Sequence, residues 1–221
     1  MSEENVYARQ SSSSSSCHGS EESITIATIL SKEICENGSL GKRLSHLDSI
    51  PHQPRVNGEI PDQDNATLDH GMLLERLTMY GLAEFQIEGD GNCQFRAIAD
   101  QLFRNPEYHR HVRKEVVKQL KIYHNLYEGY VPMSYKSYLK MMKRSGEWGD
   151  HVTLQAAADR FKAKICLITS FRDTYFIEIT PKDQVPSNEI WLSFWSEVHY
   201  NSLYAADDVP ARVTKRKHWL F

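Results

Sequence analysis

The chain has 221 residues, a formal net charge of -3 at pH 7 and a pI near 6.4. This charge balance gives no argument for nucleic-acid binding through bulk electrostatics, and no apolar run reaches the roughly 18 residues of a transmembrane helix. The N-terminus carries Glu3 and Glu4 and lacks the apolar segment of a signal peptide. The cysteines are widely spaced without a CxxC pair, which argues against a structural zinc site or a disulfide framework: Cys17, Cys35, Cys93 and Cys166. We therefore expect no metal or cofactor, no membrane association, and a reducing compartment, the cytoplasm or the nucleus.

Residues 1–68 are predicted to be a disordered N-terminal region. The serine run at 11–16 has nothing to bury, and several prolines punctuate the polar stretch that follows. The apolar residues 24–30 are either a transient helix or docking segment, or a weakly structured patch within a linker. Residues 207–221 form a polar tail whose short basic run is too small to assign a nuclear signal. This leaves residues 69–206 as the expected folded domain.

Hydrophobic spacing within that domain predicts helices first and strands last. Helical periodicity covers about 69–80, 93–105, 107–123, 135–143 and 153–161, and short extended runs lie at 85–87, 163–169, 175–179, 190–195 and 200–204. This order indicates an α+β domain of three layers, with a small central β-sheet flanked by helices. Cys166 lies inside a predicted central strand and is expected to be inert core, whereas His109 and His111 are expected on the surface.

A glycine-rich turn precedes the helix that begins at Cys93, in the sequence Gly89-Asp90-Gly91-Asn92-Cys93. Unpaired N–H groups and the partial positive charge of a helix N-terminus favour a thiolate over a thiol. Backbone N–H groups of such a turn can also hold an oxyanion. No packing role is evident for the glycines beside Asp90, so the turn favours a cysteine nucleophile. The alternative is that Cys93 is a small buried apolar residue.

A cysteine nucleophile needs a base, and His199 is the best-placed histidine. It lies between two strand-like aromatic runs, and Asn201 shares its face of the strand because side chains alternate along a strand. Asn201 is expected to accept the Nδ1–H of His199 and leave Nε2 free to face the thiol. This is a Cys–His–Asn arrangement. The alternative is a structural histidine at a sheet edge beside a turn asparagine.

Residues 89–97, taken together with residues 191–201, resemble the ovarian tumour (OTU) family of deubiquitinating cysteine proteases. The resemblance extends to Trp148-Gly149-Asp150 and the helix that follows, covers roughly residues 70–205, and is strongest toward the small plant OTU enzymes. The pairing of Asp-Gly-Asn-Cys with a distant Trp and His-Tyr-Asn is more specific than either half. No motif residue departs from the family pattern, which favours an active enzyme of the papain-like cysteine protease class.

The resemblance implies a role for each matching residue. Cys93 corresponds to the nucleophile, His199 to the general base and acid, and Asn201 to the residue that orients the imidazole. Asp90 corresponds to a motif aspartate, for which we expect a loop-shaping role rather than proton transfer. Backbone groups of the loop that includes Gly91 and Asn92 would hold the oxyanion. Since the ubiquitin tail ends in two glycines, a narrow channel is expected, with Trp148 and Trp195 as candidate walls or, equally, as aromatic core.

The implied activity is thiol-dependent hydrolysis at the C-terminal glycine of ubiquitin, on ubiquitinated proteins or polyubiquitin chains, by a monomeric enzyme. Two alternatives stay open. One is a catalytically silent ubiquitin-binding adaptor on an OTU scaffold, and the other is a hydrolase for another ubiquitin-like modifier. The sequence does not name the linkage preference, the cellular substrate or the role of the N-terminal region.

Overall fold

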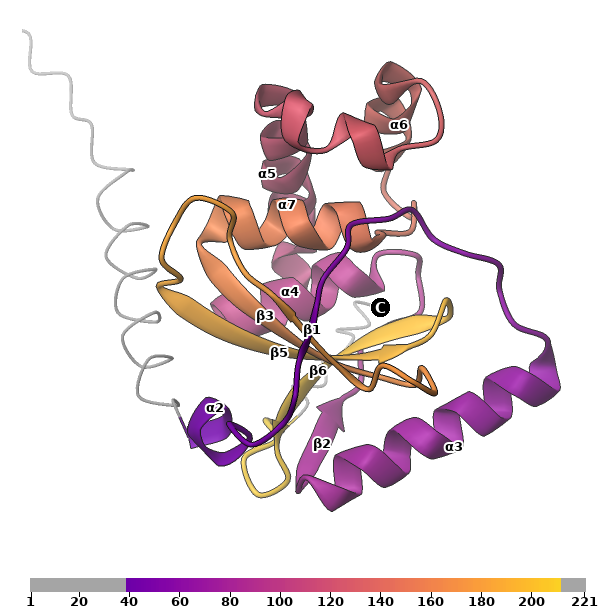
Figure 1. The fold of residues 1–221 in the computed structure, drawn as a ribbon, viewed down its shortest axis with the longest axis vertical. Coiled ribbons are helices and arrows are strands. Elements are labelled where there is room, and N and C mark those ends of the chain that lie inside the picture. The colour runs from indigo at the N-terminus through magenta and orange to yellow at the C-terminus, as the bar shows by residue number, and fades with distance from the viewer. Residues whose placement is uncertain (1–38, 212–221) are drawn as a thin grey trace, which may run out of the picture.

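A mixed β-sheet forms the centre of the computed structural model, which describes residues 39–211 (Figure 1). Within these residues the sheet has six strands in the order β1-β4-β3-β5-β6-β2. The strands are β1 (Ile50–Pro51), β2 (Leu82–Phe85), β3 (Ala163–Thr169), β4 (Phe176–Ile179), β5 (Asn188–Trp195) and β6 (His199–Ala205). β3 pairs parallel with β5 and antiparallel with β4, and β6 runs antiparallel to both β5 and β2.

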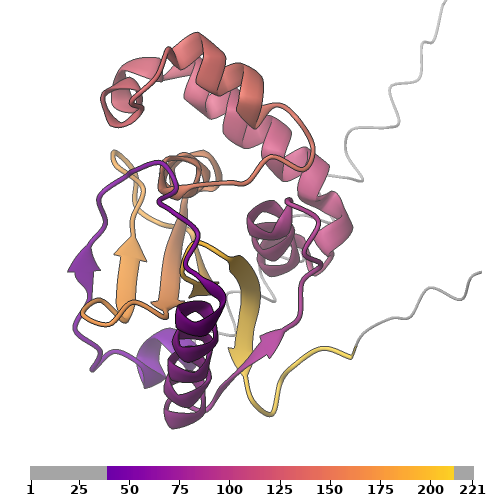
Figure 2. The same cartoon turned by 90° about the vertical axis from the view of Figure 1, so that its right-hand side faces the viewer.

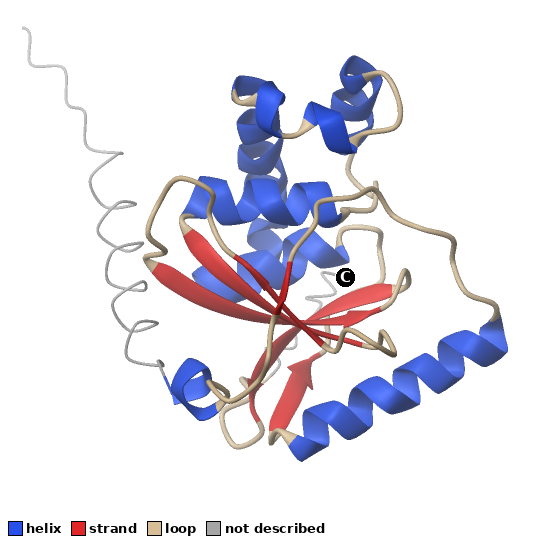
Figure 3. Cartoon of the chain, viewed as in Figure 1, coloured by secondary structure: helices blue, strands red, loops and turns tan. Residues whose placement is uncertain are grey.

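Helices cover both faces of this sheet (Figures 2 and 3). The helices are α2 (Ser39–Arg43), α3 (Gln63–Met79), α4 (Cys93–Phe103), α5 (His109–Ile122), α6 (Tyr135–Met142) and α7 (His151–Phe161). α4 and α7 pack on one face with α5 and α6 outside them, and α3 packs on the other. The expected three-layer α+β fold is confirmed.

β3 shows why the sheet is buried on both faces. Ile165 and Leu167 belong to the core cluster under α4 and α7, whereas Cys166 and Ile168 belong to the cluster under α3. Side chains of a strand alternate between faces, so an uninterrupted apolar run predicts a central strand covered on both sides. The predicted bounds of this strand agree with the structure, and burial raises the pKa of the Cys166 thiol, as expected for an inert core residue.

The folded domain was expected to start near residue 69, but ordered elements of the described residues begin before that position. α3 begins at Gln63, where Asp62 accepts hydrogen bonds from two backbone N–H groups of the first turn. Further upstream, β1 pairs parallel with β4, with Ile50 opposite Ile177. A strand of two residues leaves no periodicity in a sequence, which is why composition alone indicated disorder. The serine run, residues 24–30 and the basic run of the C-terminal tail lie outside the described residues.

His109 also differs from expectation, since it is buried at the start of α5 with 4% of its surface exposed. The predicted helix over 107–123 is divided at this point, with a short 3-10 turn at Pro106–Tyr108 before α5.

Between residues 39 and 211, no helix has both the length and the apolar character needed to cross a bilayer.

Candidate active site

The loop before α4 presents Cys93 at the first position of that helix. Gly91 in this loop has a φ of +76°, and a Cβ placed there would lie 2.1 Å from the carbonyl oxygen of Gly146. Only glycine combines this backbone conformation with such a close approach. The expectation that neither glycine has a packing role is therefore wrong for Gly91, while Gly89 has no atom near the corresponding position.

Asp90 fixes the shape of the same loop. Its carboxylate accepts hydrogen bonds from the backbone N–H and side-chain Nδ2 of Asn92, both at 3.0 Å, and from Nη2 of Arg96 at 2.8 Å. Burial alone would raise the pKa of Asp90, but the hydrogen bonds from Arg96 and Asn92 outweigh it and hold the pKa well below its usual range. A carboxylate that stays ionised and fully engaged supports the loop-shaping role expected for Asp90.

Arg113 of α5 fastens this loop to its neighbour, residues 142–147. Its Nη2 donates to Oδ1 of Asn92 at 2.8 Å and to the Glu147 carbonyl at 2.7 Å, and its guanidinium lies 3.9 Å from the centre of the Phe95 ring. Asn92 Oδ1 also accepts the Gly146 N–H at 2.9 Å. The sequence reasoning missed Arg113, although one signal was present: it lies on the same stripe of α5 as the buried valines.

The environment of Cys93 does not lower the pKa of its thiol. Burial raises the pKa and the charge of Asp90 acts in the same direction, whereas backbone N–H groups of Tyr200, Gln94 and Cys93 itself act against it. The expectation that the helix N-terminus would favour the thiolate is therefore outweighed by desolvation. A buried thiol of this kind needs an adjacent base to become a nucleophile.

The imidazole of His199 is held at the start of β6 by two acceptors. Nε2 lies 3.1 Å from Oδ1 of Asn201 and 3.1 Å from the carbonyl oxygen of Ile87. Asn201 Oδ1 also accepts the Ile87 N–H at 2.8 Å, which sets the orientation of the amide. Since Nε2 faces only acceptors here, it carries the proton, and Nδ1 is the basic nitrogen. The hydrogen bond between His199 and Asn201 is as expected. The prediction that Nδ1 makes this bond and leaves Nε2 free is wrong, because Nε2 makes it.

Cys93 and His199 line one narrow slot of about 10 Å³, although they lie in different halves of the chain. The slot is lined by Asn57, Cys93, Trp148, Gly149, Phe194, Glu197, Val198, His199 and Tyr200. Its volume is close to that of a single water-sized probe. The structure thus brings together the two residues that the sequence proposed as nucleophile and base.

The two tryptophans proposed as channel walls lie in different parts of the structure. Trp148 lines the slot and is 41% exposed. Trp195 instead donates its indole N–H to the Ala66 carbonyl of α3 at 2.9 Å, and its ring lies 4.5 Å from that of His70. The channel-wall interpretation therefore holds only for Trp148, and the aromatic-core alternative describes Trp195.

Hydrogen bonds within the proposed oxyanion loop reduce the number of backbone N–H groups that could bind an oxyanion. The backbone N–H of Asn92 is committed to Asp90, so it is not available to a substrate. Gly91 supplies the turn that allows the close approach to Gly146. The N–H of Cys93, at the first turn of α4 where no intrahelical acceptor exists, is the best-placed donor for an oxyanion.

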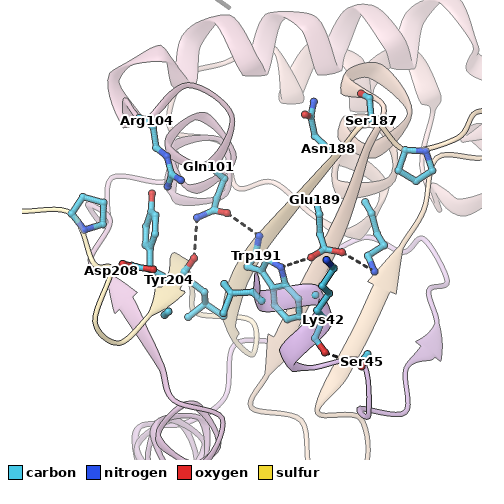
Figure 4. A pocket seen from close by; sticks show the side chains of 17 residues that line it. Lys42, Ser45, Gln101, Arg104, Ser187, Asn188, Glu189, Trp191, Tyr204 and Asp208 are labelled. Atoms are coloured by element: carbon cyan, nitrogen blue, oxygen red, sulfur yellow. Dashed lines mark hydrogen bonds and ion pairs between the residues drawn. The ribbon is translucent and has the colours of Figure 1, made fainter. Parts of the chain in front are cut away.

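A cavity larger than the slot lies away from Cys93 (Figure 4). It encloses about 660 Å³ between α2, the end of α4 and strands β5 and β6. Several of its polar groups bind one another: Gln101 bridges the Leu203 carbonyl and the Trp191 N–H, and Glu189 binds the Trp191 indole. Neither a cysteine nor a histidine is among the residues that line it, and no group of three or more potential metal ligands occurs within residues 39–211.

Comparison with known proteins gives a consistent result. Residues 88–202, which include Cys93, His199 and Asn201, match the model of the OTU-like cysteine proteases. The chain is 68% identical over 204 residues to the OVARIAN TUMOR DOMAIN-containing deubiquitinating enzyme 11 of Arabidopsis thaliana, covering 89% of this chain and 83% of that protein. It is 60% identical to enzyme 12 of the same organism, covering 96% and 97%. The solved OTU domain of OTUD1 shares the fold, with a TM-score of 0.55 and 19% identity over 65% of this chain and 99% of that one.

Proposed function

The chain belongs to the OTU-like cysteine protease family, and from that premise we propose that it is a deubiquitinating enzyme. The observation that carries the proposal is the slot that Cys93 and the His199 imidazole both line, with the Nε2–H of that imidazole held by two acceptors. A buried thiol beside an oriented histidine is the arrangement required for nucleophilic acyl transfer. The bond cleaved is the amide after the C-terminal glycine of ubiquitin.

The first half-reaction forms a thioester. Nδ1 of His199 takes the proton of the Cys93 thiol as the sulfur attacks the carbonyl carbon, and the N–H of Cys93 binds the oxyanion. As the tetrahedral intermediate collapses, His199 transfers the proton from Nδ1 to the leaving lysine amine, and the C–N bond breaks. Because burial raises the pKa of the free thiol, we expect the proton transfer to accompany the attack rather than to precede it.

The second half-reaction releases ubiquitin. Water enters the slot, gives a proton to Nδ1 of His199 and attacks the thioester carbonyl. The C–S bond then breaks, and the thiolate recovers the proton from His199. Throughout both steps Ile87 and Asn201 hold Nε2–H, so the imidazole keeps one orientation.

The narrow slot supports a substrate tail with no side chains, since the two terminal glycines of ubiquitin need little width beside Trp148. We extend the proposal to polyubiquitin chains, for which a parallel assay of all diubiquitin linkages is the direct test. We also propose a reducing compartment, because Cys93 must stay unoxidised; Cys93 and Cys166 are both free cysteines in the described residues.

The direct test uses full-length protein and ubiquitin with a fluorophore on its C-terminus. Cys93→Ala is expected to abolish turnover while leaving ubiquitin binding largely intact. Full turnover by Cys93→Ala would contradict the assignment. Binding without turnover by the unmodified protein would favour a silent adaptor instead, and turnover confined to another ubiquitin-like substrate would favour the other alternative.

A further inference from the structure

The segment between β1 and α3 passes over the N-terminal end of α7 (Figure 1). Residues 52–58 of this segment are called the strap below. The strap reaches the slot itself, because Asn57 is one of its lining residues together with Cys93 and His199. No part of the resemblance or of the matched family region, residues 88–202, includes the strap.

At one end the strap is fixed to α7. Gln155 donates through Nε2 to the Asp159 carboxylate, so its Oε1 is an acceptor, and His52 Nδ1 lies 3.3 Å from it. His52 Nε2 in turn lies 3.2 Å from Nδ1 of His151. The Arg55 carbonyl accepts the N–H of Val152 at 3.2 Å. These contacts place the strap on the N-terminal turn of α7, which directly follows the Trp148–Gly149 wall of the slot.

At its other end the strap holds the turn that carries His199. Glu197, two residues before the histidine, has a φ of +56°. This conformation is unfavourable for a residue with a Cβ and persists where the surroundings impose it. The Glu197 carboxylate accepts hydrogen bonds from Arg55 Nη2 at 2.6 Å and from the Gly58 N–H at 2.8 Å. Both contacts come from the strap.

The strap also holds the opposite wall. Asn57 donates through Nδ2 to the Gly149 carbonyl at 3.2 Å, next to Trp148. The strap is therefore bonded to both sides of the slot: to the His199 turn through Glu197, and to the Trp148 wall through Gly149. A shift of about 1 Å in such a site can lower the rate by roughly a hundredfold, so contacts of this kind bear on catalysis.

We propose that Arg55 and Asn57 are positioning residues for the hydrolysis, Arg55 acting on His199 through Glu197 and Asn57 acting on the substrate channel through Gly149. This inference rests on the proposed catalysis by Cys93 and His199. It assigns different consequences to the two contacts: loss of Arg55 lowers kcat, and loss of Asn57 raises KM.

The test compares full-length Arg55→Ala, Arg55→Lys, Glu197→Gln and Asn57→Ala with Arg160→Ala. The Arg160–Glu115 pair is a matched control, because its side chains are 38% and 12% exposed, against 42% and 9% for Arg55 and Glu197, and it lies away from the slot. Two readouts are used: kcat and KM on ubiquitin–fluorophore, and the pH dependence of Cys93 alkylation by iodoacetamide, followed by mass spectrometry.

Arg55→Ala and Glu197→Gln are expected to lower kcat at least about tenfold and to shift the pH profile of Cys93 alkylation, with recovery toward wild type in Arg55→Lys. Asn57→Ala is expected to raise KM with the alkylation profile unchanged. Arg160→Ala is expected to match wild type in both readouts. If Arg55→Ala and Glu197→Gln behave like Arg160→Ala, the proposal is overturned. That result leaves the function intact as long as Cys93→Ala is inactive, so the two failures are distinguishable.

Discussion

His199 and Asn201 are joined through Nε2 of the imidazole and Oδ1 of the amide, and the Ile87 carbonyl is a second acceptor for the same Nε2–H. Asn201 is therefore one of two groups that orient the imidazole. Its amide is itself held by the Ile87 N–H, which links the strand β6 to the chain just before the Cys93 loop. The redundancy makes the orienting role of Asn201 less critical than the chemistry of Cys93.

Asn201→Ala is expected to reduce kcat by about 10- to 100-fold, the equivalent of one hydrogen bond to a charged group. Ile87 continues to accept the Nε2–H in this variant, so activity is diminished rather than abolished. Asn201→Asp, which keeps the acceptor, is expected to be close to wild type. Steady-state hydrolysis of ubiquitin–fluorophore measures both, and a loss at Asn201→Ala as large as at Cys93→Ala would show that the role is misassigned.

Gly91→Ala and Gly89→Ala form a matched pair in one loop. At Gly91 the positive φ and the Gly146 carbonyl at 2.1 Å from a Cβ both exclude a side chain, whereas Gly89 has no atom within 4 Å of the added carbon. We expect Gly91→Ala to lower kcat/KM about 100-fold and stability by roughly 1–3 kcal/mol. Gly89→Ala is expected to match wild type in urea unfolding and in turnover. Equal behaviour of the two variants would contradict the packing role of Gly91.

Arg113→Lys tests the connection between the Cys93 loop and residues 142–147. Lysine retains the charge but not the planar fork that reaches Asn92, Glu147 and the Met142 carbonyl together. We expect a stability loss of about 3 kcal/mol in urea unfolding, accompanied by reduced turnover. Arg110→Lys, at an exposed position of α5, serves as the control. A wild-type result for Arg113→Lys would mean that the fork is dispensable.

The His52–His151 pair predicts a stability that falls on acidification. Burial lowers the pKa of His52 to about 4 and that of His151 to about 3, with the positive charge of Arg55 acting in the same direction on both and Lys182 on His52. As the pH drops below the ordinary pKa of histidine, the unfolded chain therefore binds protons that the folded protein does not. Between pH 7 and pH 5, each of the two histidines lowers the free energy of unfolding by about 2 kcal/mol. The free energy of unfolding therefore falls as the pH drops from 7 to 5, and it recovers as the pH rises again.

Urea unfolding at pH 7 and pH 5 measures this effect as a difference between wild type and a variant with both histidines replaced by Asn. Burial also raises the pKa of Asp150 to about 6, which acts in the opposite direction, but this carboxyl is common to both proteins and cancels. The variant is expected to lose less stability than wild type over this pH interval. An identical pH dependence in the two proteins would rule out buried neutral histidines.

Much of the fold follows from local patterns in the sequence. The bounds of β3 agree with the structure because its apolar run is covered on both faces. The start of α4 is signalled by a glycine turn followed by a buried helical stripe, and α7 begins at a capping box formed by Asp150 and Thr153. The pairing of Cys93 with His199 could be predicted from the sequence because each residue lies in its own distinctive motif.

The remaining features depend on contacts between distant residues. The strap is polar and short of periodicity, and its order comes from partners such as Glu197, 142 positions from Arg55. The protonated nitrogen of His199 is fixed by the Ile87 carbonyl, a backbone group that no side-chain pattern reveals. The pKa of Cys93 is set by burial in the folded protein, which outweighs the helix-terminus effect visible in the sequence.

The most direct test of the nucleophile–base pair is covalent labelling by ubiquitin that carries a C-terminal electrophile. Full-length protein is predicted to gain one ubiquitin, attached at Cys93 by peptide mapping, with no adduct in Cys93→Ala and a slower reaction in His199→Gln. An adduct at Cys17, Cys35 or Cys166, or tight binding of the probe with no adduct at all, would contradict the account.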